Sequence, residues 1–169
     1  VRRLVREHRL AGHVADRDQR FDGRKFISFR SDGLEHSMPP FGVDQIMDAG
    51  NGKMWLRQGN LIGLFDPVSF HYSGIPIKSK NKLPVQSELY LFADSKGNTF
   101  LCTHKAGLLY YNKTENQFTA ENLPIRIPDG WTVNSLFEDT ITGDYWVCSD
   151  KGLAVYQSKT QTLISRNNN

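Results

Sequence analysis

Short apolar stretches separated by polar turns run along most of the chain, and they recur with a period of about 45 residues. The breaks between the stretches are rich in Gly, Asn and Asp, which is typical of β-strands joined by tight turns. No stretch long enough for a helix has apolar positions spaced by three and four residues. The pattern therefore predicts an all-β chain that is built from repeats.

Three aromatic residues mark the repeat, since Trp55, Phe100 and Trp146 are 45 and 46 residues apart. A glycine precedes each by three residues, a second aromatic follows after ten or eleven, and a further apolar residue comes seven residues later. These are Gly52, Gly97 and Gly143, then Phe65, Tyr111 and Tyr156, then Tyr72, Phe118 and Leu163. Each repeat thus contains four short strands, and another glycine (Gly63, Gly107 or Gly152) is predicted to begin the third strand.

Four strands in about 45 residues fit one blade of a β-propeller, and they fit leucine-rich or helical repeats badly. A single four-stranded sheet buries only part of its faces, so radial stacking of neighbouring sheets completes the core. We expect the repeated aromatic to fill the space between sheets. Burial of such a side chain stabilises the fold by about 2–3 kcal/mol.

The repeats divide the chain into three blades, at residues 31–78, 79–122 and 123–169, while residues 1–30 match the end of a preceding blade. The prediction is a β-propeller fragment of about three and a half four-stranded blades, forming one incomplete domain. The first residue is Val1 and no hydrophobic signal core follows it, so we interpret it as the cut end of a longer polypeptide. Propellers close with at least four blades. We therefore expect the remaining blades of the same polypeptide, or a second copy, to cover two bare faces.

The composition shows which classes of protein this sequence fits. With 38% hydrophobic and 23% charged residues, the chain is typical of a folded protein. Basic residues are concentrated before residue 31, but they form no recognisable nucleic-acid motif, so no nucleic-acid partner is expected. Cys102 and Cys148 are too few for a disulfide framework and lie in apolar strands, which predicts buried free thiols. A bridge between neighbouring blades stays open, although equivalent strands are expected to lie too far apart for it.

The repeat resembles the two-component regulator propeller repeat over residues 40–165. The motif of Asp, turn, Gly and aromatic stands here as Asp48 to Trp55, Asp94 to Phe100 and Asp139 to Trp146, with Phe100 departing from the usual Trp. The resemblance implies the periplasmic sensory region of a hybrid two-component histidine kinase, which responds to an oligosaccharide. It also implies that the membrane is reached only through downstream segments and that this segment is not itself an enzyme and needs no cofactor.

Two alternatives stay open, a stand-alone propeller that acts as a protein-interaction scaffold and, less favoured, a propeller lyase. A lyase of that kind needs histidines and a metal ion clustered at the central channel. The five histidines share no metal-ligand spacing and do not recur at one repeat position, so we expect no catalytic residues and no metal site.

Ligands of propellers usually meet the face formed by the turns between second and third strands and by the connections between blades. Here the turns are expected at residues 57–60, 103–105 and 149–151, and the connections at 73–87 and 121–131. Their side chains suit sugar hydroxyls, and one aromatic that looks exposed suits stacking on a sugar ring. The predicted ligand-binding set is Arg57, Gln58, Asn60, His104, Lys105, Trp131, Asp150 and Lys151. Ordinary solvated loop residues are the alternative interpretation.

Overall fold

The computed structural model describes residues 18–21, 26–29, 33, 36–79, 88–104 and 107–166. Every regular element within these ranges is a strand, which confirms the prediction of an all-β chain. An antiparallel pair, β1 (Asp18–Phe21) and β2 (Phe26–Phe29), comes first. Most of residues 1–30, which the sequence assigns to a preceding blade, lie outside the described part of the chain.

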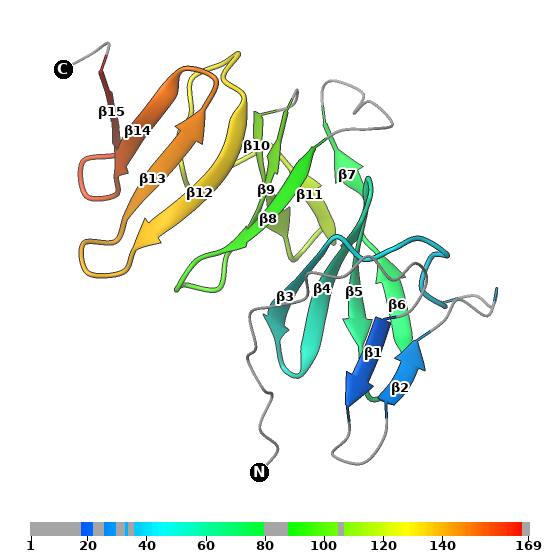
Figure 1. Cartoon of the computed structure of the whole chain (residues 1–169). Helices are drawn as coiled ribbons and strands as arrows, with labels where there is room; N and C mark the ends of the chain where they lie inside the picture. Colours follow the sequence, from blue (N-terminus) through cyan, green and yellow to red (C-terminus); the bar gives the residue numbers. More distant parts are fainter. Residues whose placement is uncertain are drawn as a thin grey trace.

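Three sheets follow, each containing four consecutive antiparallel strands, and the middle one has a fifth strand that is described below. Sheet 1 contains β3 (Gln45–Gly50), β4 (Lys53–Gln58), β5 (Leu61–Asp66) and β6 (His71–Gly74). Sheet 2 contains β8 (Leu89–Ala93), β9 (Thr99–Thr103), β10 (Gly107–Asn112) and β11 (Gln117–Thr119). Sheet 3 contains β12 (Val133–Asp139), β13 (Asp144–Ser149), β14 (Gly152–Gln157) and β15 (Thr162–Ser165). The three sheets lie next to one another, with sheet 2 between sheets 1 and 3 (Figure 1). This arrangement fits consecutive blades of a propeller.

The turn after the first strand of each sheet is closed by an aspartate. In sheet 2, Oδ1 of Asp94 accepts hydrogen bonds from the amides of Lys96 (2.9 Å) and Asn98 (2.8 Å). Asp48 and Asp139 accept bonds from turn amides in the same way in the other two sheets. The following glycine takes a positive φ, which only glycine adopts without strain.

Gly63 does not start the third strand, contrary to the sequence-based expectation. Gly107 and Gly152 have positive φ values and begin β10 and β14, whereas β5 begins at Leu61 and Gly63 lies inside it. The ring of Tyr72 packs over this position, so a Cβ at Gly63 would lie 2.3 Å from the ring. Gly63 is therefore required for close packing rather than for a turn.

Aromatic side chains fill both spaces between sheets. Trp55 meets Tyr111 edge-on, with ring centroids 4.8 Å apart, and its ring centroid is 5.5 Å from that of Phe118. Phe100, which is fully buried, lies 6.1 Å from the ring of Tyr145 in sheet 3. The prediction that the repeated aromatic lies between sheets is confirmed for Trp55 and Phe100.

For Trp146 that prediction is wrong, because the indole is 41% exposed. Trp146 occupies the position of Phe100, in a cross-strand row that runs from Phe137 through Trp146 and Val155 to Ile164. No other sheet in the described part of the chain faces this row. The expectation of two buried thiols fails for the same reason. Cys148 is exposed on this face, whereas burial raises the pKa of the Cys102 thiol to about 12.

Sheet 2 has five strands rather than the predicted four. Strand β7 (Ile77–Lys78), which the sequence assigns to the first repeat, pairs in parallel with β11. The amide of Phe118 donates to the Pro76 carbonyl (2.8 Å), and at the corresponding place in sheet 1 the amide of Tyr72 donates to the His36 carbonyl (2.8 Å). An edge strand has unpaired backbone groups, and incoming main chain satisfies part of the outer edge in both sheets.

Candidate functional site

Equivalent strands of the three sheets run in the same direction, so their corresponding ends lie at the same end of the stack. Glu138, near the end of β12, accepts hydrogen bonds from the amide and hydroxyl of Ser95, just beyond the end of β8. Asp66, at the end of β5, and Asn116, beyond the end of β10, line one cavity. The turns between second and third strands, at residues 59–60, 104 and 150–151, therefore lie at one end of the stack. We call this end the turn rim.

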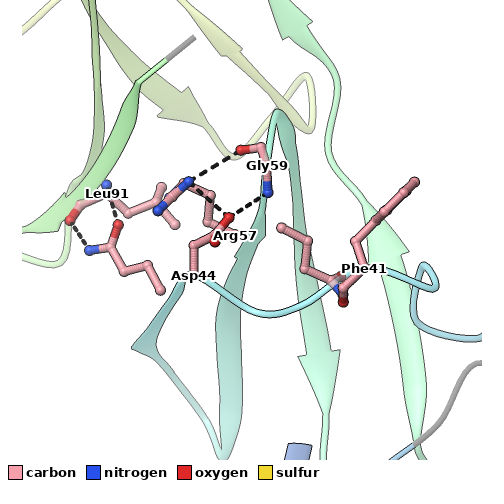
Figure 2. A network of polar contacts seen from close by, with 7 residues as sticks. Phe41, Asp44, Arg57, Gly59 and Leu91 are labelled. Carbon is pink, nitrogen blue, oxygen red and sulfur yellow. Dashed lines mark hydrogen bonds and ion pairs between the residues drawn. The ribbon is translucent and has the colours of Figure 1, made fainter. Parts of the chain in front are cut away.

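An aspartate that the sequence did not single out organises the first turn of the rim. Oδ2 of Asp44 accepts hydrogen bonds from the Gly59 amide (2.6 Å) and from Nη1 of Arg57 (3.1 Å), as Figure 2 shows. The Asp44 amide in turn donates to the Arg57 carbonyl (2.8 Å). Arg57 is thus held in place, and its buried Nε has no hydrogen-bond partner among the described residues. Because Nε is buried, a ligand can reach only the outer part of the guanidinium, whose side chain is 19% exposed.

Gln58 does not present its side chain to solvent. It is buried, and its Nε2 donates to the carbonyls of Pro39 (3.1 Å) and Phe41 (2.6 Å). These two bonds of Nε2 anchor the segment that leads into β3, while the buried Oε1 has no hydrogen-bond partner among the described residues. Its neighbour Asn60, which completes the turn, is half-buried. Of this pair only Asn60 is accessible at the rim.

Thr132 joins the other two turns of the rim. Its Oγ1 donates to the His104 carbonyl (2.8 Å), its amide donates to Oδ1 of Asp150 (2.9 Å), and its carbonyl accepts from the Asp150 amide (3.1 Å). The backbone of His104 and the residue Asp150 are thereby both tied to Thr132, and His104 is exposed. Both Thr132 and Asp44 stand just before the first strand of a sheet. The sequence signal that could have identified Asp44 and Thr132 is a polar residue directly before the first strand of a repeat.

Asp150 and Lys151 form an exposed ion pair, with Nζ and Oδ2 2.9 Å apart. The Lys151 side chain, followed by the Thr132 amide, holds the pKa of Asp150 below its usual value. Lys105 lies outside the described residues. The expectation that Trp131 is exposed is wrong. It is half-buried and packs against the apolar cluster between sheets 2 and 3, because the connection runs across the end of that interface.

The turn rim presents hydrogen-bonding groups to a ligand but little net charge. Arg57 and Lys151 are each paired with a neighbouring aspartate, so little charge is left uncompensated. Within the described ranges, no three His, Cys, Asp or Glu side chains come together as a metal site, and no helix there is long and apolar enough to cross a membrane. Such a surface suits a neutral polar ligand.

No protein-family model matches the chain, and no curated protein matches it. Several solved structures match this chain. The extracellular domain of BT4673 from B. thetaiotaomicron, described as a one-component system, is 22% identical with a TM-score of 0.56, covering 78% of this chain and 17% of that one. A second structure of that domain, described as a hybrid two-component system, is 23% identical with a TM-score of 0.55, covering 77% and 17%.

The extracellular domain of the hybrid two-component system BT3049, from the same organism, is 14% identical with a TM-score of 0.53, covering 89% of this chain and 27% of that one. The chain therefore spans a small part of these proteins and shares their fold over that part. The expected resemblance to the sensor regions of hybrid two-component systems is confirmed at the level of the fold.

Proposed function

We propose that this chain is part of the extracytoplasmic, ligand-sensing propeller of a hybrid two-component signalling histidine kinase. The observation that carries the proposal is the shared fold of its stacked sheets and the extracellular domains of BT4673 and BT3049. On this account the protein is placed in the periplasm. The segment itself binds rather than catalyses, and phosphotransfer belongs to other parts of the full-length protein.

In this proposal the three sheets are successive propeller blades. The row from Phe137 to Ile164 is then the face that receives the next blade, from the same polypeptide or from a second copy. Its residues occupy the positions that Phe92, Phe100 and Tyr110 hold in sheet 2, where they pack against sheet 3. This correspondence supports a continued stack.

We place the ligand, an oligosaccharide, at the turn rim. The partly exposed guanidinium of Arg57 and the exposed residue His104 suit the hydroxyls of a neutral sugar. Asn60, Asp150 and Lys151 add further polar groups around them. Gln58 and Trp131 contribute by holding the connections rather than by direct contact.

The test is a titration of the chain with a panel of neutral oligosaccharides, followed by NMR and calorimetry. His104→Ala and Arg57→Lys should each weaken binding about tenfold, whereas Lys159→Ala, an exposed residue at the opposite end of sheet 3, should not change it. Arg57→Lys keeps a positive charge near Asp44 but removes the planar guanidinium with its several donors. Absence of binding across the panel, or equal affinities for all three variants, would refute a sugar site at the rim.

A further inference from the structure

A cavity of about 360 Å³ opens between sheets 1 and 2, at the end opposite the turn rim. Sheet 1 supplies most of its wall, through Lys53, Leu64, Asp66, His71 and Ser73, and Asn116 closes it from the turn between β10 and β11. Its volume lies near the lower bound for ligand sites in proteins, which is about 300 Å³. The cavity is therefore of a size for a small molecule.

Opposite charges meet at its mouth. Asp66 pairs across the strands with His71, and Lys53 is the residue before Met54, which pairs with Phe65. Oδ1 of Asp66 is engaged by the Val68 amide (2.8 Å) and the Ser69 amide (3.3 Å). These amides first, and Lys53 last, hold the pKa of Asp66 below its usual value. The Ser69 side chain also hydrogen-bonds to Asp66 and lines the cavity, and the carboxylate is charged at neutral pH, so it can attract the cationic group of a ligand.

Neutral polar groups and an apolar wall complete the cavity. Ser73 is half-buried and offers a hydroxyl. Oδ1 of Asn116 accepts the Tyr111 hydroxyl (2.7 Å), which leaves Nδ2 as a donor. Leu64 and Ile75 supply the apolar surface. One small space therefore holds a cation, an anion, a hydroxyl, an amide and an aliphatic wall.

At the next interface, between sheets 2 and 3, the residues equivalent to the cavity lining differ, and the carboxylates of Asp94 and Glu138 are engaged by Tyr145 and Ser95. Where sheet 1 has Leu64 and Ser73, the register places Tyr110, which packs into the apolar cluster there, and the buried Thr119. Asn98, Asn112 and Gln117 stand at the positions that Lys53, Asp66 and His71 hold in sheet 1. Repeat packing alone therefore does not require the cavity or its charges.

We propose that this cavity binds a small zwitterion of the amino-acid type. Its ammonium group meets the carboxylate of Asp66, its own carboxylate meets Lys53 and the hydroxyl of Ser73, and its apolar side chain lies against the aliphatic wall. A lone anion would meet the Asp66 charge and a lone cation the Lys53 charge, whereas a zwitterion compensates both. This site is separate from the sugar site proposed for the turn rim.

The test uses L-leucine and L-alanine as probes, with 4-methylpentanoate and 3-methylbutylamine as analogues of leucine that carry one charge. Calorimetry should show leucine binding at least about tenfold tighter than either analogue, a difference of about 1.4 kcal/mol. Asp66→Asn should weaken leucine binding by at least about tenfold. The fold should tolerate this change, because Asn112 makes the same turn, accepting from the Thr114 and Glu115 amides.

A second variant and a matched control complete the design. Leu64→Tyr copies Tyr110 of sheet 2 and should fill the cavity, abolishing binding, whereas Asn112→Asp adds a charge at the filled interface and should change nothing. No leucine or alanine binding up to about 10 mM would overturn the proposal. Equal affinity for the single-charge analogues, or unchanged binding by Asp66→Asn, would also overturn it. The sugar titration is unaffected by these outcomes, so the two proposals fail separately.

Discussion

The face of sheet 2 that meets sheet 3 and the corresponding face of sheet 3 have the same pattern of side chains in opposite surroundings. Phe100 is 0% exposed and its counterpart Trp146 is 41% exposed, while Leu108 is 3% and its counterpart Leu153 is 59% exposed. Strand register and side-chain direction are the same on both faces. The neighbouring sheet, and not the residue type or the strand, therefore decides what is buried.

The exposed face of sheet 3 therefore has the composition of an interface. Phe137 is 64% exposed on it, and Val155 and Ile164 extend the row to the outer strand. Soluble monomers rarely expose contiguous apolar patches larger than a few hundred Å². A further sheet stacked on this face would place Trp146 in the surroundings that Phe100 already has.

The largest difference between the two faces should be seen in stability. Phe100→Ala removes a fully buried ring and should lower the free energy of unfolding by about 3–5 kcal/mol. Trp146→Ala in the same chain should cost about 1 kcal/mol, because much of the indole already faces water. Urea denaturation measures both losses. Similar losses for the two variants would mean that the faces are not in different surroundings.

The second difference should be in self-association. An open apolar face brings copies together, so sedimentation velocity should show a concentration-dependent increase in mass. Phe137→Lys should weaken this association by at least about tenfold, because a charge would have to be buried. Ile141→Lys, a change in the nearby turn where the side chain is 94% exposed, is the matched control and should have little effect. Equal self-association of the two variants would contradict the prediction that the exposed face of sheet 3 mediates it.

A smaller difference comes from a polar contact on the covered side. Burial first, and the hydrogen bond to Asp94 (2.8 Å) second, raise the pKa of Tyr145 above its usual value of 10.0. The folded state holds this proton more tightly than the unfolded state. The contribution to stability is therefore complete below about pH 10 and is lost as the pH rises through the folded pKa.

Tyr145→Phe removes that contribution. The variant should be less stable by about 1 kcal/mol at neutral pH, owing to the lost hydrogen bond. It should also lose less stability than the parent chain between about pH 10 and pH 11.5. Thermal melts across this range measure both effects. A steeper alkaline loss in the variant would contradict the assigned role of Tyr145.

The local features of the fold follow from the sequence because they depend on near neighbours. Alternating apolar residues, the aspartate turns and the positions of Trp55 and Phe100 are all set within one repeat. The sheet boundary and the fifth strand are not, since β7 pairs with β11, about 40 residues further along the chain. The exposure of Trp146 depends on which sheets stand beside it, which no pattern within its own repeat encodes.

The candidate site shows the same division. The turns of the rim were predicted as places in the repeat, but the roles of their residues depend on distant partners. The pattern predicts a surface amide at Gln58, whereas its side chain binds carbonyls 19 and 17 residues earlier in the chain. No local pattern marks the contact that Thr132 makes, because its bond to the His104 carbonyl spans 28 residues. Sequence therefore located the rim but not the contacts that build it.

The most direct measurement is the alkylation rate of the two cysteines. Cys102 and Cys148 occupy equivalent positions, one on the covered face and one on the open face. With iodoacetamide and peptide mass spectrometry, at concentrations low enough to keep the chain monomeric, Cys148 should react at least about a hundredfold faster in the folded protein. In urea the two rates should become equal. Similar rates in the folded protein, whether both are fast or both are slow, would contradict the covered and open faces described for sheets 2 and 3.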